Sequence, residues 1–195
     1  GLKGIAPDFV SVHLRRDGGR QKTPAYRALN PQALVPTIEE GDFRLTQSLA
    51  IIEWLDETRP GPRLLPSDPN LRAEVRAFAQ VIACDIHPLQ NLRVLDYLKA
   101  EFGADQAALD RWCARWIGDG LAACEALLAR RRPTPFCFGD APSLADICLI
   151  PQMFSATRFG ADTSTLPRLT AIQAVCEALP AFRNAHPKAQ PDWEA

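Results

Sequence analysis

The sequence has little net charge, no long apolar run and no closely spaced cysteine pair. Its 195 residues carry 22 Lys and Arg against 23 Asp and Glu, a net charge of −1, so it lacks the basic footprint of a nucleic-acid-binding protein. No stretch approaches the roughly 18 consecutive apolar residues that a membrane span needs, and no signal-peptide pattern opens the chain. With 47% hydrophobic residues, the composition predicts a folded protein with one sizeable core or two smaller ones.

The cysteines and histidines are too scattered to predict a metal site. No two cysteines form a C-x-x-C pair, and most lie among apolar neighbours, where free Cys behaves as a small hydrophobe. We therefore expect reduced, structural thiols in a reducing cytoplasm, and no metal. The residues concerned are Cys84, Cys113, Cys124, Cys137, Cys148 and Cys176, with His13, His87 and His186.

The most informative segment runs from Ala33 to Leu55. It predicts a strand with a proline, a tight turn, a second short strand, and a helix that begins with the polar pair Gln47-Ser48. A helix N-terminus with free backbone N–H groups and a small hydroxyl binds a carboxylate well, so this segment predicts a site for a small anion. The alternative is that Ser48 only caps its helix.

The flanking sequence predicts two domains. Alternating apolar and polar residues at 9–14 predict a half-buried strand, and a short helix is expected at 24–29. Four prolines within residues 59–69 forbid regular structure and mark a linker. We therefore predict a first domain at residues 1–62 and an all-helical second domain at residues 63–195.

The second domain reads as a series of helices. Residues 109–128 place apolar side chains at three- and four-residue intervals, which is one face of a long helix. Ser143 and Asp146 form a variant of the capping box at the start of another helix. Further helices are expected at 71–83, 89–102 and 169–179, with an interruption at 85–88 and an irregular tail.

Several of these motifs, in this order and spacing, resemble the zeta class of the glutathione transferases. The resemblance implies an α/β thioredoxin-like N-terminal domain plus an all-α C-terminal domain. The first strand and helix of that fold are absent from this numbering, and so is the Ser-rich motif that activates the glutathione thiol. No catalytic residue can therefore be assigned. The motifs are Leu29-Asn30-Pro31, Val35-Pro36-Thr37, Thr46 to Glu53, His87 to Leu92, and Ser143 to Gln152.

The resemblance implies which residues bind glutathione. Val35 is forced toward an extended conformation by the following proline, which leaves its N–H and C=O free to pair with a peptide ligand. Each assignment has a structural alternative: an ordinary edge proline, a solvated loop glutamine at 21, a helix cap at 85, a structural histidine at 87. The implied contacts are Gln21, Val35, a cis Pro36, Gln47, Ser48, Asp85 and His87.

The implied substrate-binding residues are Asn91, Arg93 and Arg158. A guanidinium binds a carboxylate with two parallel hydrogen bonds and stays charged, which suits a substrate with a carboxylate at each end. The alternatives are that Arg93 pairs with Asp96 on its helix surface and that Arg158 is a solvated charge before a helix end.

The resemblance implies a glutathione-dependent cis–trans isomerase of a maleyl β-keto acid, acting by reversible addition of the thiolate in aromatic-compound or tyrosine catabolism. The zeta class includes maleylacetoacetate and maleylpyruvate isomerases, and the sequence leans toward the latter. One alternative is a transferase or dehalogenase of α-halo acids, and another is a non-catalytic glutathione-fold binding protein. A homodimer is also implied, with no role for nucleic acid or membrane.

Overall fold

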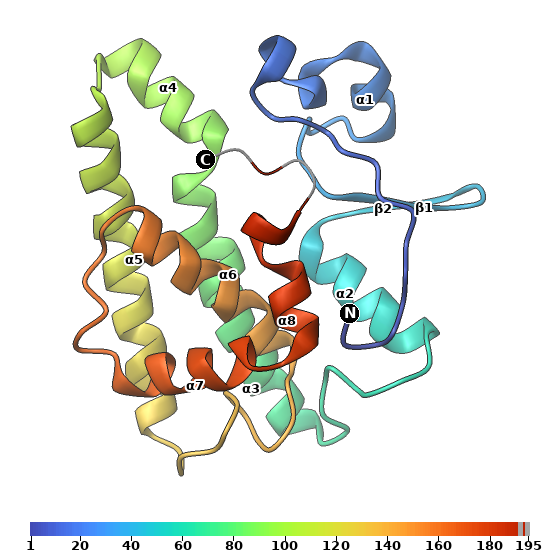
Figure 1. Ribbon diagram of the computed structural model, residues 1–195, viewed down its shortest axis with the longest axis vertical. Helices are drawn as coiled ribbons and strands as arrows, with labels where there is room; N and C mark the ends of the chain where they lie inside the picture. The colour runs from blue at the N-terminus through green and yellow to red at the C-terminus, as the bar shows by residue number, and fades with distance from the viewer. Residues whose placement is uncertain (191–192, 194–195) are drawn as a thin grey trace. The chain divides into compact units, whose positions relative to one another are not determined.

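The computed structural model describes residues 1–190 and Trp193, and it divides into two compact units (Figure 1). One unit contains Gly1–Arg63 together with the segment that starts at Asn184, and the other is Leu64–Arg183. The division between Arg63 and Leu64 lies inside the proline-rich linker. The segment from Asn184 groups with the first unit, whereas the sequence prediction placed it in the helical domain 63–195. None of the described helices is long and apolar enough to cross a membrane.

The first unit is built on one β-hairpin and the helix that follows it. The strands pair antiparallel with Thr37 opposite Thr46, and Gly41 supplies the positive φ of the tight turn, 56°. The preceding helix begins with a Thr23 cap and a proline at its first position, which is a favoured start. In chain order the elements are short 3₁₀ turns at Arg16–Gly18 and Arg20–Lys22, α1 (Pro24–Leu29), β1 (Thr37–Glu40), β2 (Phe43–Thr46) and α2 (Ser48–Thr58).

The strand predicted at residues 9–14 is wrong. Residues 5–13 have no regular structure, and Phe9 and Val10 are 62% and 80% exposed. Alternating polarity produces a strand only where a neighbouring strand supplies ladder hydrogen bonds and one face is buried. In the part of the chain that the structure describes, the sheet contains β1 and β2 alone, and neither pairs with this segment.

A buried carboxylate fixes α2 within the first unit. Asp56, on the last turn of α2, accepts a hydrogen bond from Lys3 Nζ at 3.1 Å and lies 3.4 Å from Arg63 Nε. The side chains of Lys3 and Asp56 are only 5% and 1% exposed. Because a buried charge is tolerated only when it is paired, this cluster holds both ends of the segment 3–63 against α2.

The second unit is a set of packed helices with an apolar core. α3 packs against α6, and α5 packs against α6 and α7. The apolar face predicted at 109–128 is confirmed, since Leu109, Ile117 and Leu128 are all buried along α5. The bounds are α3 (Pro69–Gln80), α4 (Leu92–Phe102), α5 (Gln106–Ala129), α6 (Leu144–Arg158) and α7 (Pro167–Glu177). α8 (Pro180–Ala185) starts in this unit and ends in the segment that groups with the first unit, where a 3₁₀ turn (Pro187–Ala189) follows.

Two sequence expectations about interruptions have different outcomes. The break predicted between α3 and α4 is confirmed: a π-helical segment, Val81–Ile86, leads into a 3₁₀ turn, His87–Gln90. The irregular tail is wrong for residues 180–189, where a proline at the first position starts both α8 and the following 3₁₀ turn.

The capping box predicted at the start of α6 is present and buried. Asp146 Oδ2 accepts hydrogen bonds from the backbone N–H and the hydroxyl of Ser143, both at 2.8 Å. Its Oδ1 accepts from the backbone N–H of Cys137, also at 2.8 Å. Asp146 is fully buried, and its one carboxylate accepts the hydrogen bonds of polar groups at the helix start and in the loop before it.

All six cysteines are free thiols, as the sequence predicts, and we expect only one to react quickly. Cys84 is exposed, whereas burial raises the pKa of Cys113 to about 11 and that of Cys124 to about 12. The thiolate is the reactive form, and a thiol with a pKa near 12 is ionised to only ~1 part in 10⁴ at pH 8. The buried thiols, and Cys148, whose pKa is also about 12, should therefore react slowly.

Mass spectrometry of the native protein after brief treatment with a thiol reagent at pH 8 measures this difference. One label is expected, absent in Cys84→Ser, with six labels after denaturation. Rapid addition of two or more labels to the native protein would contradict the burial described above.

Candidate functional site

The start of α2 leaves hydrogen-bond donors unused. The cap residue is Gln47, and the first intrahelical hydrogen bond runs from Ile51 N to Gln47 O at 2.9 Å. Within the described residues, the N–H groups of 48–50 and the Ser48 hydroxyl have no acceptor, and Ser48 is exposed. Ser48 therefore does not cap its helix, and that alternative is wrong. Several donors and the positive end of the helix dipole together suit a carboxylate.

Gln47 has an unusual backbone conformation. Its φ of 73° and ψ of 116° are rare for a residue with a side chain, and such strain costs roughly 1–3 kcal/mol. Its side-chain amide donates to Gln32 Oε1 at 2.7 Å, which links the helix start to the loop before β1. Strained residues of this kind concentrate at ligand sites, because the surrounding structure must hold them.

Within the described chain, Val35 has an unused backbone N–H and C=O next to a cis proline. The Val35–Pro36 peptide bond is cis, and the Val35 side chain is half-exposed. Its N–H and C=O make no hydrogen bond to any described residue. A backbone N–H and C=O that are both unused can pair with a peptide ligand as a neighbouring strand would.

Gln21 is buried rather than solvated, so the alternative of a solvated loop glutamine is wrong. Its Nε2 donates to the Leu14 carbonyl at 3.1 Å, whereas its Oε1 has no partner among the described residues. The side chain is 5% exposed. A buried acceptor without a partner is costly, and a ligand N–H that reached it would remove that cost.

In the second unit, Asp85 and His87 lie where the π-helical segment meets the 3₁₀ turn, and both are exposed. Surrounding protein nevertheless removes water from the imidazole, and this desolvation lowers the pKa of His87 below its usual 6.5. The neutral form of His87 therefore predominates at pH 7. Asp85 does not cap the resumed helix, since the cap residue of α4 is Asn91.

The predicted substrate residues lie at helix ends. Asn91 Oδ1 accepts from the backbone N–H of Arg93 at 3.1 Å, which caps α4. Arg93 is exposed and forms no ion pair with Asp96 in the described part of the chain. Arg158 is the last residue of α6, exposed, with its guanidinium 5.4 Å from the Phe159 ring centroid. No hydrogen bond between described residues joins Arg158 to either of the other two.

Comparison with known proteins decides the family. Family models of the glutathione S-transferase N-terminal and C-terminal domains match residues 1–58 and 106–188. A maleylpyruvate isomerase from Ralstonia sp is 48% identical over 98% of this chain and 90% of its own length. The holo structure of a maleylpyruvate isomerase, described as a bacterial zeta-class glutathione transferase, matches with a TM-score of 0.93 at 48% identity, covering 99% of this chain and 91% of that one. The chain belongs to the zeta class of the glutathione transferases.

A second solved relative has ligands bound. A maleylacetoacetate isomerase from Methylobacterium extorquens AM1, solved with malonate and glutathione bound, matches with a TM-score of 0.94 at 42% identity, covering 100% of this chain and 91% of that one. The predicted fold, a small α/β N-terminal part followed by a helical part, is confirmed for this member of the class.

Sequence reasoning missed two residues that support Val35 in this zeta-class chain. Tyr26 Oη and Asn30 Nδ2 both donate to the Leu34 carbonyl, at 2.8 and 2.7 Å, and both side chains are buried. Tyr26 Oη also lies 3.0 Å from the Thr37 hydroxyl on β1. These contacts fix the peptide plane that precedes Val35. The only sequence signal was the Asn30-Pro31 pair, which belongs to the family pattern but does not by itself point to Val35.

Proposed function

We propose that this zeta-class chain is a glutathione-dependent cis–trans isomerase of a maleyl β-keto acid, either maleylpyruvate or maleylacetoacetate. The observation that carries the proposal is the start of α2, where free N–H groups and the Ser48 hydroxyl stand ready for a carboxylate. The similarity to proteins named maleylpyruvate and maleylacetoacetate isomerase supports it. A homodimer in the cytoplasm is part of the same proposal.

The residues of the first unit fit glutathione. Ser48 and the α2 dipole hold the γ-glutamyl carboxylate, with Gln47 beside them. The Val35 N–H and C=O pair with the cysteinyl backbone next to Pro36. The unpartnered Gln21 Oε1 accepts an N–H at the glycyl end. For the second unit, the family resemblance assigns Asp85 to the ligand ammonium and His87 to a further contact with glutathione, and desolvation keeps the pKa of His87 below 6.5.

The cationic residues of the second unit hold the diacid. Arg93 and Arg158 are exposed guanidinium groups without a carboxylate partner in the described chain, so each can take a substrate carboxylate. The amide nitrogen of Asn91 remains a donor, because its Oδ1 caps α4. When bound, glutathione supplies a thiolate that adds reversibly to the cis double bond and allows rotation about it. The arginines orient the diacid and stabilise the negative charge that develops on it.

Substrate turnover by the full-length protein, with any residues that precede Gly1, tests this function. With glutathione present, we expect rapid conversion of maleylpyruvate or maleylacetoacetate to the fumaryl isomer, and slow turnover of an α-halo acid. Faster halide release than isomerisation would favour the transferase or dehalogenase reading. Glutathione binding with no turnover of either substrate would favour a binding protein.

Ser48→Ala should weaken glutathione binding about 10-fold to 100-fold. The hydroxyl donates to a charged carboxylate, and such a hydrogen bond contributes about 1.5–3 kcal/mol. Isothermal titration of glutathione into the two proteins measures the change. Thr58→Ala is a matched control, because among the described residues the Thr58 hydroxyl bonds only to the Trp54 carbonyl, at the far end of α2. Equal losses in both variants would contradict the assignment of Ser48.

A further inference from the structure

The 3₁₀ turn His87–Gln90 is hydrogen-bonded to two different helices. Trp112 Nε1, on α5, donates to the Leu89 carbonyl at 2.7 Å. Gln90 Nε2 donates to Gln152 Oε1, on α6, also at 2.7 Å. Residues 90 and 152 are 62 positions apart in the sequence, so this second bond is a long-range tertiary contact. Two successive residues of the turn, Leu89 and Gln90, are therefore hydrogen-bonded to α5 and α6.

The residue before the turn, Ile86, is held by close packing against α5. Ile86 is buried and ends the π-helical segment. A Cβ added at Gly120 on α5 would lie 2.3 Å from Ile86 Cδ1, so the absence of a side chain at Gly120 lets Ile86 approach α5 closely. A π-helical segment is rare and is often found at functional sites.

Packing alone does not explain a glutamine at position 152. It is 2% exposed on a helix whose neighbouring positions Leu149 and Met153 are buried and apolar. Its Nε2 has no hydrogen-bond partner among the described residues. A buried amide with one group unsatisfied destabilises a core relative to an apolar residue of the same size. Stability therefore gives no reason for glutamine at this position.

The geometry points to Gln152 as a positioning residue for catalysis. Through Gln90 it fixes the turn that carries His87 at one end and leads into Asn91 and Arg93 at the other. This inference rests on the proposed function, because it is those three residues that are proposed to contact glutathione and the diacid. Trp112 supports the same turn through the Leu89 carbonyl.

Three variants test this role. Gln152→Met removes the hydrogen bond at similar side-chain volume, and Gln90→Met/Gln152→Met removes both partners. We expect Gln152→Met to raise the KM of the diacid ~3-fold to 10-fold, with the glutathione dissociation constant changed less. The double variant should recover the melting temperature, because no amide is left without a partner, yet keep the high KM. Trp112→Phe removes the hydrogen bond to the Leu89 carbonyl and should raise the same KM. This third variant keeps the inference testable if the Gln152 variants do not fold.

A merely structural role gives a different pattern. In that case the double variant recovers both the melting temperature and the KM, and the inference is overturned. Gln173→Met is the matched control, since Gln173 Nε2 makes an equally short bond of 2.7 Å to Glu177 on α7. It should leave both KM values unchanged, and a KM increase there equal to that of Gln152→Met would also overturn the inference.

A second readout separates this inference from the proposed function. The protein has three histidines, so the His87 imidazole can be assigned in NMR spectra by its loss in His87→Gln. If Gln152 positions the turn, Gln152→Met should reduce the desolvation of the His87 imidazole and move its pKa up toward 6.5. An unchanged His87 titration would overturn the inference. A wild-type protein without isomerase activity would count against the proposed function alone, and the titration would still decide the role of Gln152.

Discussion

Replacing Arg93 with alanine is expected to lower kcat/KM for the maleyl keto acid about 10-fold to 100-fold, while the glutathione dissociation constant changes by less than about 2-fold. Arg93 is an exposed residue in the first turn of α4 and has no ion pair in the described chain, so its guanidinium is available to a ligand. A charge-assisted pair with a carboxylate contributes about 1.5–3 kcal/mol. We expect Arg158→Ala to act in the same direction.

Arg115→Ala is the matched control for this prediction. Arg115 is also an exposed arginine of the second unit, but it pairs with Asp119 on its own helix at 2.7 Å. Such a surface pair contributes little, so kinetic constants should stay near those of the wild type. Steady-state kinetics with each substrate varied in turn separates the two effects. A parallel loss of diacid turnover and glutathione affinity in Arg93→Ala would mean that Arg93 has a structural role.

Asp146→Ala should lower the free energy of unfolding by about 3–5 kcal/mol, which is a large share of the stability of a typical domain. The change removes the acceptor of three hydrogen bonds and leaves the buried N–H groups of Cys137 and Ser143 unsatisfied. Urea unfolding followed by circular dichroism measures the loss, and low yield of folded protein is the expected accompanying result.

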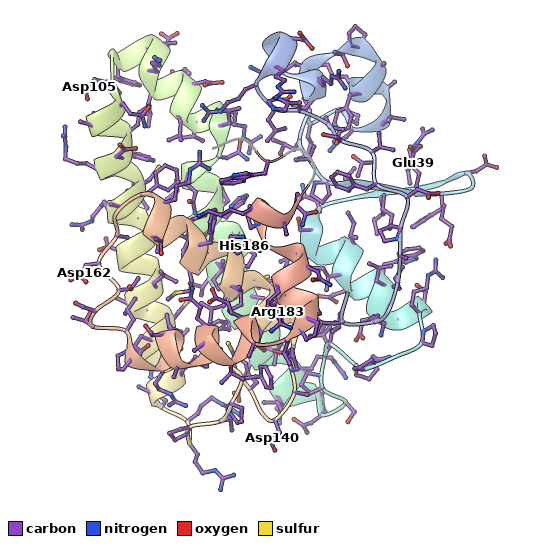
Figure 2. The ribbon with its side chains drawn as sticks, viewed as in Figure 1. Glu39, Asp105, Asp140, Asp162, Arg183 and His186 are labelled. Atoms are coloured by element: carbon purple, nitrogen blue, oxygen red, sulfur yellow. The ribbon has the colours of Figure 1, made fainter. Side chains whose placement is uncertain are left out.

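Asp105 provides the comparison for Asp146. It also caps a helix, accepting from Ala108 N at 2.7 Å at the start of α5, where it is labelled in Figure 2. Because Asp105 is exposed, Asp105→Ala should cost only about 1 kcal/mol. If the two variants lost equal stability, burial of the Asp146 carboxylate would not be the reason for its effect.

Local sequence signals predicted the elements that depend on local physics. The apolar face at 109–128, the capping box of Ser143 and Asp146, and the hairpin before α2 all follow from spacing or cap chemistry within a few residues. The segment 9–14 shows the limit of this reasoning. Its alternating pattern is equally local, but a strand needs a partner elsewhere in the chain, and the pattern says nothing about that partner.

The candidate site was also predicted only where it depends on local sequence signals. Gln47 and Ser48 stand out as a polar start to an amphipathic helix, and the structure shows that the Ser48 hydroxyl is not used as a cap. The bond between Gln90 and Gln152 could not be predicted, because it joins residues 62 positions apart. The π-helical segment likewise depends on the fit of Ile86 against α5. The roles of Arg93 and Arg158 rest on the family resemblance and stay predictions.

The fate of glutathione during turnover tests the central claim most directly. The full-length protein, with any residues that precede Gly1, is mixed with maleylpyruvate and a tenfold smaller amount of glutathione, and both small molecules are followed by NMR. A cis–trans isomerase converts all the substrate to the fumaryl isomer and returns the glutathione as free thiol, because the thiolate that adds is later expelled. Consumption of one glutathione per substrate, or conversion at the same rate without glutathione, would contradict the proposed function.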